Sequence, residues 1–510
     1  MICEVIVDIA HSDVDKIFDY VCDYPVEAGT RVVVPFGAGK TTGFVVRGKD
    51  TTDCPPEKLK RIIRADDYPA INNECLMLAR KIAARYRCPL ALCFRLFLPS
   101  EMRTGKVSET YRTYAHLTGA EVEISPRAKA QLALISYLRE HPEEDAARLR
   151  ESFGGAVNAL AAKGAIVLEK RRVLRDPYQS VPQTAQEHIL TPAQSQAVKT
   201  VEDAKQTVTL IHGVTGSGKT EIYLTLIARA LGMGKTAIFL VPEISLTPQM
   251  LSQLRARFGA QAAILHSGLS AGERFDEWQR LRSGEARIAI GARSAVFAPL
   301  ENIGIIVIDE EHDGSYSSES SPRYNTFDIA LLRAQYNGGK LVLGSATPSV
   351  ETYRRAKEGE FALITLKDRI NARPMPEVHI ADMRREVKRG NASFLSVRLR
   401  ERLEACLDRG NQAILFLNRR GYSQTVICRD CGYVAKCKNC DVALTYHSEE
   451  NCLKCHYCGM RYKKLSICPD CGGVHLGYMG TGTQRVVSEL QSQYPSARIL
   501  RMDVDTTRGK

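Results

Sequence analysis

The feature that most constrains this chain is the segment Gly213–Thr220, which reads GVTGSGKT and fits the pattern G-x-x-x-x-G-K-[ST]. The apolar run Thr207–Ile211 precedes it, and the helical pattern Glu221–Ala228 follows it. A strand, a glycine-rich turn and the start of a helix are the context that a phosphate-binding loop requires. Glycines allow backbone N–H groups to converge on phosphate oxygens, and the helix N-terminus adds partial positive charge. The segment therefore predicts a nucleotide site in an α/β sheet, with a chance glycine-rich turn as the alternative.

The polar positions of this loop have predicted roles. Lys219 is placed to reach the β- and γ-phosphates, and the Thr220 hydroxyl to bind Mg²⁺. Upstream, the stretch Leu190–Gln194 places Gln194 on the adenine edge, or alternatively on the surface of a helix. The predicted nucleotide contacts are Gly213, Thr215, Gly216, Ser217, Gly218, Lys219, Thr220 and Gln194.

A second element of a nucleotide site is the segment Ile305–His312, which reads IIVIDEEH. Its four apolar residues predict a buried strand, and its acids follow at the C-terminal end, where an open α/β sheet places ligand chemistry. Asp309 is predicted to hold Mg²⁺, directly or through water, and Glu310 to orient and deprotonate the attacking water. Together with Lys219, these two acids are the predicted catalytic residues.

Apolar strands alternate with helical patterns from residue 188 to about 360, which predicts a parallel α/β sheet. A second α/β segment is predicted to start with a strand at Gln412–Leu417 and to resume with a helix at Thr483–Tyr494 and a strand at Arg498–Met502. The strands predicted in the first segment are Thr207–Ile211, Thr236–Val241, Ala262–Leu265, Ile288–Gly291, Ile303–Ile308 and Lys340–Leu343.

Two smaller units precede the α/β part. In the first, strands at Arg31–Gly37 and Thr42–Arg47 flank a turn, and a helix is predicted near Asn73–Tyr86. In the second, three short helices and a strand pair between residues 109 and 178 suggest a winged-helix unit. Such units bind DNA in some proteins and act as spacers or protein contacts in others. Residues 176–185 have the composition of a linker.

The charge and the apolar pattern narrow the class of protein. A chain of 510 residues holds roughly three or four domains at typical sizes. A net charge of +12 suits a polyanionic partner, although it fits equally a protein that is basic only for solubility. The first residues lack the basic start of a signal peptide, and no apolar run approaches the ~20 residues of a membrane helix. We expect a cytoplasmic protein without a membrane partner.

Eight of the sixteen cysteines form four C-x-x-C pairs within a short window. Each pair places two thiolates on one tight turn, so two pairs complete a tetrahedral Zn²⁺ site and eight ligands make two closed, structural sites. The spacing alone permits either a nested or a sequential combination of the pairs. Cys452 and His447 lie nearby and are expected to be packing or surface residues. The predicted ligands are Cys428, Cys431, Cys437, Cys440, Cys455, Cys458, Cys468 and Cys471.

Three further segments fall at predicted strand ends: Val241–Gln249, Gly291–Pro299 and Gly344–Ser349. A D-E-x-H box followed by S-A-T is the pattern of superfamily 2 helicases. With the cysteine array, these motifs make the whole chain resemble the PriA (primosomal protein N′) family of bacterial replication-restart DNA helicases. The resemblance implies a multidomain α/β fold with RecA-like parallel-sheet helicase lobes, a small β-rich N-terminal domain, a winged-helix domain and a two-zinc insertion.

The resemblance also implies domain limits and a function. The domains would be 1–105 for binding a DNA 3′ end, 109–178 for the winged helix, 188–365 for the ATP-binding lobe 1, and 366–510 for lobe 2 with a zinc insertion at 426–475. The family consists of ATP-dependent 3′→5′ DNA helicases that act at stalled forks and D-loops and initiate primosome assembly. Its cofactors are ATP, Mg²⁺ and two Zn²⁺, and its partners are branched and single-stranded DNA, primosome proteins and single-stranded DNA-binding protein.

Specific residues carry these implied contacts. By resemblance the zinc ligands pair in the nested arrangement, with the first and last C-x-x-C pairs on one ion. The first domain would bind a 3′ end through Phe18, Asp19, Gly37 and Lys60. An aromatic-rich loop at residues 313–324 would sense DNA through Tyr316, Arg323 and Tyr324. Ser317, Asn325 and Thr326 depart from the residues more usual around that loop.

Superfamily 2 motors complete their site with a Q-x-x-G-R-x-x-R-like helix that supplies an arginine finger, and no such segment occurs here. We therefore expect an incomplete lobe 2, a fragment of a longer protein and impaired ATP hydrolysis. One alternative function is a fork-DNA-binding scaffold with little ATPase activity. Another is a small-molecule kinase, which would have no use for the S-A-T segment or the cysteine array.

Overall fold

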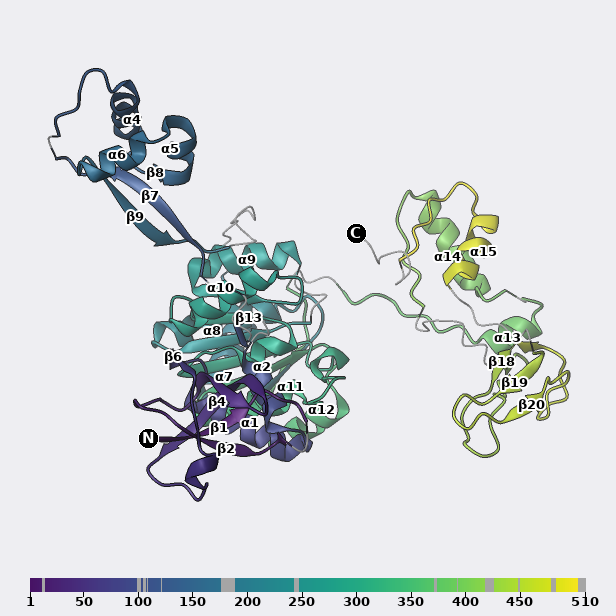
Figure 1. The fold of residues 1–510 in the computed structure, drawn as a ribbon. Helices are drawn as coiled ribbons and strands as arrows, with labels where there is room; N and C mark the ends of the chain where they lie inside the picture. The colour runs from purple at the N-terminus through teal and green to yellow at the C-terminus, as the bar shows by residue number, and fades with distance from the viewer. Residues whose placement is uncertain are drawn as a thin grey trace. The chain divides into compact units, whose positions relative to one another are not determined.

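The computed structural model describes residues 1–11, 14–98, 102–103, 107, 109–120, 122–175, 189–242, 247–370, 374–391, 393–417, 426–447, 450–477 and 483–502. These residues belong to two compact units, Met1–Pro374 and Met375–Lys510 (Figure 1). The predicted linker at 176–185 and part of the Val241–Gln249 motif lie outside the described residues. None of the described helices combines the length and apolarity needed to cross a bilayer.

The larger unit contains a seven-stranded parallel sheet in the order β12-β13-β11-β14-β15-β10-β16. All six predicted strands of the first α/β segment are confirmed, and β16 joins the edge as a seventh strand that was not predicted. The strands are β10 (Val208–Gly213), β11 (Thr236–Leu240), β12 (Ala262–Leu265), β13 (Ile288–Gly291), β14 (Ile303–Asp309), β15 (Lys340–Ser345) and β16 (Ala362–Leu366).

Helices pack on both faces of this sheet, and successive residues of each strand point to opposite faces, so every strand residue has a buried environment to enter. Ile305 and Val307 pack with residues of α7, α8 and α9 on one face, whereas Ile306 and Ile308 pack with residues of α10 and α11 on the other. The apolar runs that predicted the strands therefore reflect burial on two sides. The helices are α7 (Pro192–Asp203), α8 (Lys219–Gly232), α9 (Pro248–Phe258), α10 (Ala271–Arg282), α11 (Thr326–Asn337) and α12 (Val350–Lys357).

The N-terminal part forms a six-stranded sheet in the order β5-β2-β1-β4-β3-β6. The predicted hairpin is confirmed as β3 and β4, and the predicted helix as α1, which begins after Asn72, whose side chain accepts a hydrogen bond from the Cys75 N–H. The elements are β1 (Ile2–Val7), β2 (Ile17–Val21), β3 (Thr30–Phe36), β4 (Gly39–Lys49), β5 (Lys60–Arg61), β6 (Arg64–Pro69), α1 (Asn73–Tyr86) and α2 (Leu90–Phe97).

The next segment combines three helices with a three-stranded antiparallel sheet in the order β8-β7-β9. Leu134, Leu138, Val157 and Leu160 form its separate apolar core. The predicted helices and strand are present, and the winged-helix assignment stays a prediction. The elements are β7 (Tyr111–Leu117), α4 (Lys129–Glu140), β8 (Glu144–Asp145), α5 (Ala146–Phe153), α6 (Ala156–Ala162) and β9 (Ile166–Arg172).

In the second unit the predicted strands at Gln412–Leu417 and Arg498–Met502 are wrong, because neither segment has a ladder partner among the described residues. Leu415 and Ile499 still pack against the core of α14 and α15, so apolar burial occurs without sheet pairing. The predicted helix is confirmed as α15. The elements are α13 (Met383–Lys388), α14 (Val397–Asp408), β17 (Ile427–Cys428), β18 (Thr445–His447), β19 (Cys452–Lys454), β20 (Arg461–Lys463), β21 (Leu476–Gly477) and α15 (Thr483–Gln493).

Candidate functional site

The predicted phosphate loop joins the C-terminal end of β10 to the first turn of α8. Gly216 and Gly218 adopt φ angles of +82° and +80°, a region that favours glycine. The Lys219 ammonium donates to the Gly213 carbonyl at 2.8 Å, and the buried Ser217 hydroxyl has no hydrogen-bond partner among the described residues. A lysine held on loop backbone and an unpartnered buried hydroxyl fit a site for an anionic ligand. Thr215 is exposed and Thr220 is half-buried on the same loop.

Gln194 is buried beside this loop, so the alternative of a surface residue is wrong. Its amide oxygen accepts from the Thr191 N–H at 2.8 Å, and its amide N–H donates to the Gly218 carbonyl at 3.2 Å. Thr191 caps α7 in return, which explains why this helix begins there. Contact of Gln194 with adenine stays a prediction. In the structure, Gln194 holds the phosphate loop through its hydrogen bond to the Gly218 carbonyl.

The last residue of β16 and the segment that follows it also hold the phosphate loop, which no sequence motif signals. The Val214 N–H donates to the Leu366 carbonyl at 3.1 Å, and the Ile370 N–H donates to the Gly216 carbonyl at 3.0 Å. Arg369 lies against Gly216, and its buried Nε has no partner among the described residues. The phosphate loop is therefore held by hydrogen bonds with two segments, Gln194 of α7 and the stretch Leu366–Ile370.

Asp309 ends β14 directly opposite Gly344 of β15. Burial and the neighbouring Glu310 raise the pKa of Asp309 to about 6, while Lys219 acts in the opposite direction. The Oδ1 atom of Asp309 is buried without a partner in the described chain, which fits a carboxylate that binds a metal ion or its water. Glu310 has a φ of +46°, so its backbone is strained where the predicted base emerges.

Tyr223 is a site residue that the sequence does not signal. The ring is fully buried under the sheet, and its hydroxyl has no hydrogen-bond partner in the part of the chain described. A Cβ on Gly344 would lie 1.6 Å from this hydroxyl, so glycine makes the room for it. Burial and the charge of Asp309 raise the pKa of Tyr223 well above its usual range, which keeps the hydroxyl protonated beside that carboxylate.

The acidic segment and the Gly344–Ser349 motif form one hydrogen-bonded network because β14 and β15 are neighbours. The Glu311 carboxylate accepts from the Ser349 N–H at 2.7 Å and from the Thr352 hydroxyl at 3.0 Å. His312 Nδ1 lies 2.8 Å from the Ser345 hydroxyl. The two strand ends are therefore joined by direct hydrogen bonds.

The aromatic-rich loop is anchored to the same site. The Tyr316 hydroxyl donates to the Asp309 carbonyl at 2.7 Å, and Arg293 donates to the Ser317 carbonyl at 2.5 Å. Arg293 also lies over the Tyr324 ring, 5.8 Å from its centroid. Tyr316 and Tyr324 are each 4% exposed, so the prediction that their faces stack on bases does not match this conformation. Arg323 is exposed, as a DNA contact requires.

The predicted 3′-end residues come from different strands of the N-terminal sheet: Phe18 and Asp19 lie on β2, and Gly37 lies in the turn between β3 and β4. Phe18 packs edge-to-face on Phe36 at 5.3 Å, and Gly37 follows at the exposed turn with a φ of +57° and open space where a Cβ would lie. Lys60 is exposed on β5, paired with β2, the strand that carries Asp19. The sequence missed Lys49 and Thr52, both of which contact the Asp19 carboxylate.

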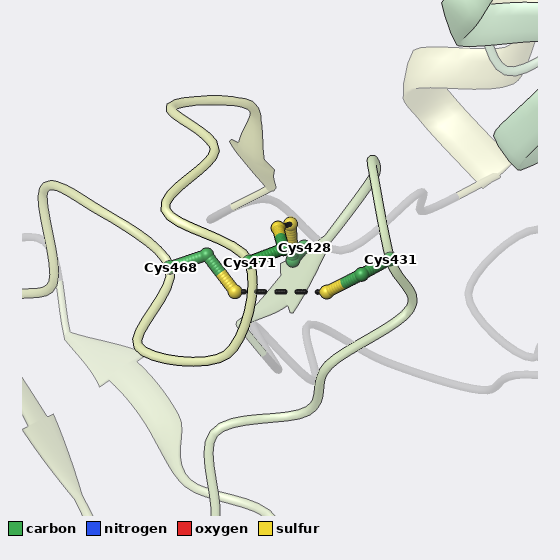
Figure 2. Close-up of side chains that lie close together, drawn as sticks. All are labelled: Cys428, Cys431, Cys468 and Cys471. Carbon is green, nitrogen blue, oxygen red and sulfur yellow. Dashed lines mark hydrogen bonds between the residues drawn. The ribbon is translucent and has the colours of Figure 1, made fainter.

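The eight cysteines form two groups of four, each with its Sγ atoms within 4.8 Å of one another. The grouping is nested: Cys428, Cys431, Cys468 and Cys471 converge in one group (Figure 2), and Cys437, Cys440, Cys455 and Cys458 in the other. Sulfur pairs at 3.6–3.7 Å match the edge of about 3.8 Å expected for a tetrahedron of Zn–S bonds. Both groups therefore fit closed zinc sites.

Cys452 and His447, the two further candidates near the cysteine pairs, lie outside these groups. His447 Nε2 lies 3.1 Å from His456 Nε2, and the Cys452 thiol donates to Glu450. Tyr462 acts from outside the ligand set as well: its hydroxyl lies 3.2 Å from Cys437 Sγ and lowers the pKa of that thiol. A lower thiol pKa favours the thiolate that binds zinc.

Three family models match separate parts of the chain. Residues 4–99 match a 3′ DNA-binding domain of PriA, and residues 191–356 match a DEAD/DEAH box helicase. Residues 437–462 match the Cys-rich region of the PriA DNA helicase. These ranges cover the N-terminal sheet, the parallel sheet with its phosphate loop, and the second cysteine group.

Curated relatives match nearly the whole chain. It is 39% identical to the replication restart protein PriA of Bacillus subtilis (strain 168), over 99% of this chain and 73% of that protein. It is 35% identical to the namesake protein of Haemophilus influenzae, over 97% of this chain and 69% of the relative, and 34% identical to that of Chlamydia pneumoniae, over 98% and 70%. With the helicase sheet, the 3′ DNA-binding domain and the paired cysteine groups, these matches show that the chain belongs to the replication restart protein PriA family.

Proposed function

We propose that this chain contributes the ATP-binding lobe, the 3′-end pocket and the zinc module of a 3′→5′ DNA helicase that restarts replication at stalled forks and D-loops. The observation that carries the proposal is the arrangement of the phosphate loop, Asp309 and the Gly344–Ser349 motif at the carboxyl ends of the neighbouring strands β10, β14 and β15, where hydrogen bonds join the acidic segment to that motif and to the aromatic-rich loop. Such an arrangement places the atoms that would hold a nucleotide beside a loop that would contact DNA.

In this proposal the chain's own groups position the nucleotide. Backbone N–H groups of Gly213–Thr220 and the start of α8 bind the phosphates, and Lys219 exchanges the Gly213 carbonyl for phosphate oxygen. Glu310 orients the attacking water and accepts its proton. Mg²⁺, held by Thr220 and Asp309, would neutralise the charge that develops on the γ-phosphate.

Coupling to DNA would pass through Tyr316. The Tyr316 hydroxyl donates a hydrogen bond to the Asp309 carbonyl. The Thr326 hydroxyl in turn donates to the Tyr316 carbonyl at 2.8 Å. Movement of the aromatic-rich loop on DNA would therefore shift the backbone that carries the catalytic acids. Exposed Arg323 would make the first contact with phosphate, and the two tyrosines would reach bases only after the loop rearranges.

The other two parts serve binding. Phe18 would stack on the terminal base of a nascent strand. Asp19 would accept a hydrogen bond from the 3′-hydroxyl of that strand, and Lys60 would form an ion pair with a phosphate. Two Zn²⁺ ions would hold the cysteine groups as a rigid module, since four thiolates leave no open position for chemistry. Primosome proteins and single-stranded DNA-binding protein are the proposed partners, in the cytoplasm.

ATP turnover, measured with and without forked DNA, tests this function on the chain and on a version extended to the length of its relatives. We expect DNA to stimulate turnover, and Lys219→Ala to abolish it while Lys199→Ala, an exposed change on α7, leaves it intact. Tight fork binding without DNA-stimulated turnover in either version would favour a DNA-binding scaffold and overturn the motor assignment.

A further inference from the structure

Two described residues hold the carboxylate of Asp19, both through its Oδ2 atom. Lys49 Nζ lies 2.8 Å from Asp19 Oδ2, and the Thr52 hydroxyl donates to the same atom. The Thr52 oxygen accepts from the Cys54 N–H at 3.0 Å, which directs its own hydrogen toward Asp19. Among the described residues no hydrogen bond to Oδ1 is formed, so this oxygen keeps lone pairs for an outside donor.

Lys49 also pairs with a second carboxylate, that of Glu4, which explains why a lysine lies between the two acids. Glu4 lies directly opposite Asp19 in the register of β1 and β2, so two carboxylates face each other on one side of the sheet. Lys49 Nζ lies 3.2 Å from Glu4 Oε1 and therefore bridges the two acids. Like charges directly opposite in a sheet repel, and the bridge offsets that repulsion.

We propose that Lys49 and Thr52 are positioning residues that fix the Asp19 carboxylate with Oδ1 available, and thereby set the preference for a DNA end that carries a 3′-hydroxyl. The inference rests on the proposed role of Asp19 at the 3′ end. A carboxylate only accepts hydrogen bonds, so a 3′-hydroxyl satisfies it, a 3′-deoxy end leaves it unpaired, and a 3′-phosphate repels it.

The chain supplies a matched control for Lys49. Arg47 also lies on β4 and pairs with Glu4 at 2.6 Å, but it feels Asp19 only as a neighbouring charge and forms no hydrogen bond or ion pair with it. Its side chain is 67% exposed, against 28% for Lys49. Removal of Arg47 therefore takes away a similar charge from the same strand without touching the atom that holds Asp19.

The test is the ratio of dissociation constants for oligonucleotides that end in 3′-hydroxyl, 3′-deoxy or 3′-phosphate, measured by fluorescence anisotropy. We expect the native chain to prefer the 3′-hydroxyl about tenfold or more, as a hydrogen bond to a charged group allows. Lys49→Met and Thr52→Val should reduce that preference to about twofold. Arg47→Met and Thr52→Ser should retain the preference. Because serine keeps the hydroxyl that valine lacks, this pair of variants separates loss of the hydrogen bond to Asp19 from a change in the fold.

The outcomes separate the inference from the function on which it rests. If the native chain binds all three ends equally, the proposed 3′-end role itself fails. If the native chain discriminates and Asp19→Asn does not, the 3′-end role holds. Retention of full discrimination by Lys49→Met and Thr52→Val would then overturn the inference, as would equal loss in Arg47→Met.

Discussion

Arg333 of α11 and Glu74 of α1 form an ion pair with Nε and Oε1 2.6 Å apart and with both side chains buried. The guanidinium also donates to the carbonyls of Val296, Ala298 and Leu300. With a further bond from Nη2 to Glu74 Oε2 at 3.3 Å, all five guanidinium N–H groups are used, which is what a buried charge requires. The pair fastens the N-terminal sheet and its helices to the parallel sheet.

Loss of one partner should be costly because it leaves the other charge buried and unpaired. We expect Glu74→Ala to lower the free energy of unfolding of this unit by about 3–5 kcal/mol, measured by urea denaturation. Glu358→Ala, which breaks an exposed pair with Arg354, should cost under about 1 kcal/mol. Similar costs for both variants would contradict the structural role of the buried pair.

The Tyr223 hydroxyl should matter for metal-linked nucleotide binding rather than for folding. We expect Tyr223→Phe to raise several-fold the Mg²⁺ concentration needed for half-maximal binding of a fluorescent ATP analogue, since the donor beside Asp309 is lost. Thermal stability should stay unchanged or rise, because the hydroxyl has no partner within the described chain. Tyr20→Phe removes a hydroxyl that donates to the Pro35 carbonyl in the N-terminal sheet, and should leave the Mg²⁺ dependence unaltered.

The pKa of Asp309 predicts a specific pH dependence of stability without nucleotide or added Mg²⁺. Because the folded pKa is raised from 3.8 to about 6, this group's stabilising contribution is present below about pH 4 and is lost as the pH rises through about 6. Asp309→Asn avoids that loss, so its advantage in thermal unfolding should grow up to about pH 6 and then level at roughly 2–3 kcal/mol.

Asp313 supplies the control of opposite sign. Its hydrogen bonds with Ser315 hold the pKa of that carboxyl below its usual value, so its contribution is present at neutral pH and is lost as the pH falls. Asp313→Asn should therefore be less stable than the native chain at neutral pH, and the deficit should shrink in acid. A difference between native and Asp309→Asn chains that is independent of pH would show that Asp309 is not held in an unfavourable ionised state.

The cysteine groups predict zinc stoichiometry group by group. The purified chain should contain two zinc atoms, and Cys428→Ser or Cys437→Ser should each reduce the content by one, measured by elemental analysis. Cys452→Ser should retain both atoms, since this thiol lies outside the groups. Loss of both atoms from one single variant would mean that the two groups fold only together.

The chemistry of the nucleotide site could be predicted from the sequence because its determinants are local. Gly216 and Gly218 act through their backbone torsion angles, and Lys219 through its fixed spacing from them. Both properties depend only on residues that are adjacent in the sequence. The six strands were predictable for a related reason, since burial on both faces forces a continuous apolar run. The C-x-x-C pairs indicated zinc through the same short-range spacing, although spacing alone left the nested combination open.

Only the tertiary structure decided which distant residues complete each site. Tyr223 meets Asp309 because Gly344 on a neighbouring strand leaves room for its hydroxyl, and Lys49 reaches Asp19 through the register of three antiparallel strands. The loop that carries Tyr316 and Tyr324 is likewise held by Arg293, some twenty to thirty residues earlier in the chain. Sequence patterns report the torsions and spacings of adjacent residues, whereas these contacts depend on how strands align and pack, which no local pattern encodes.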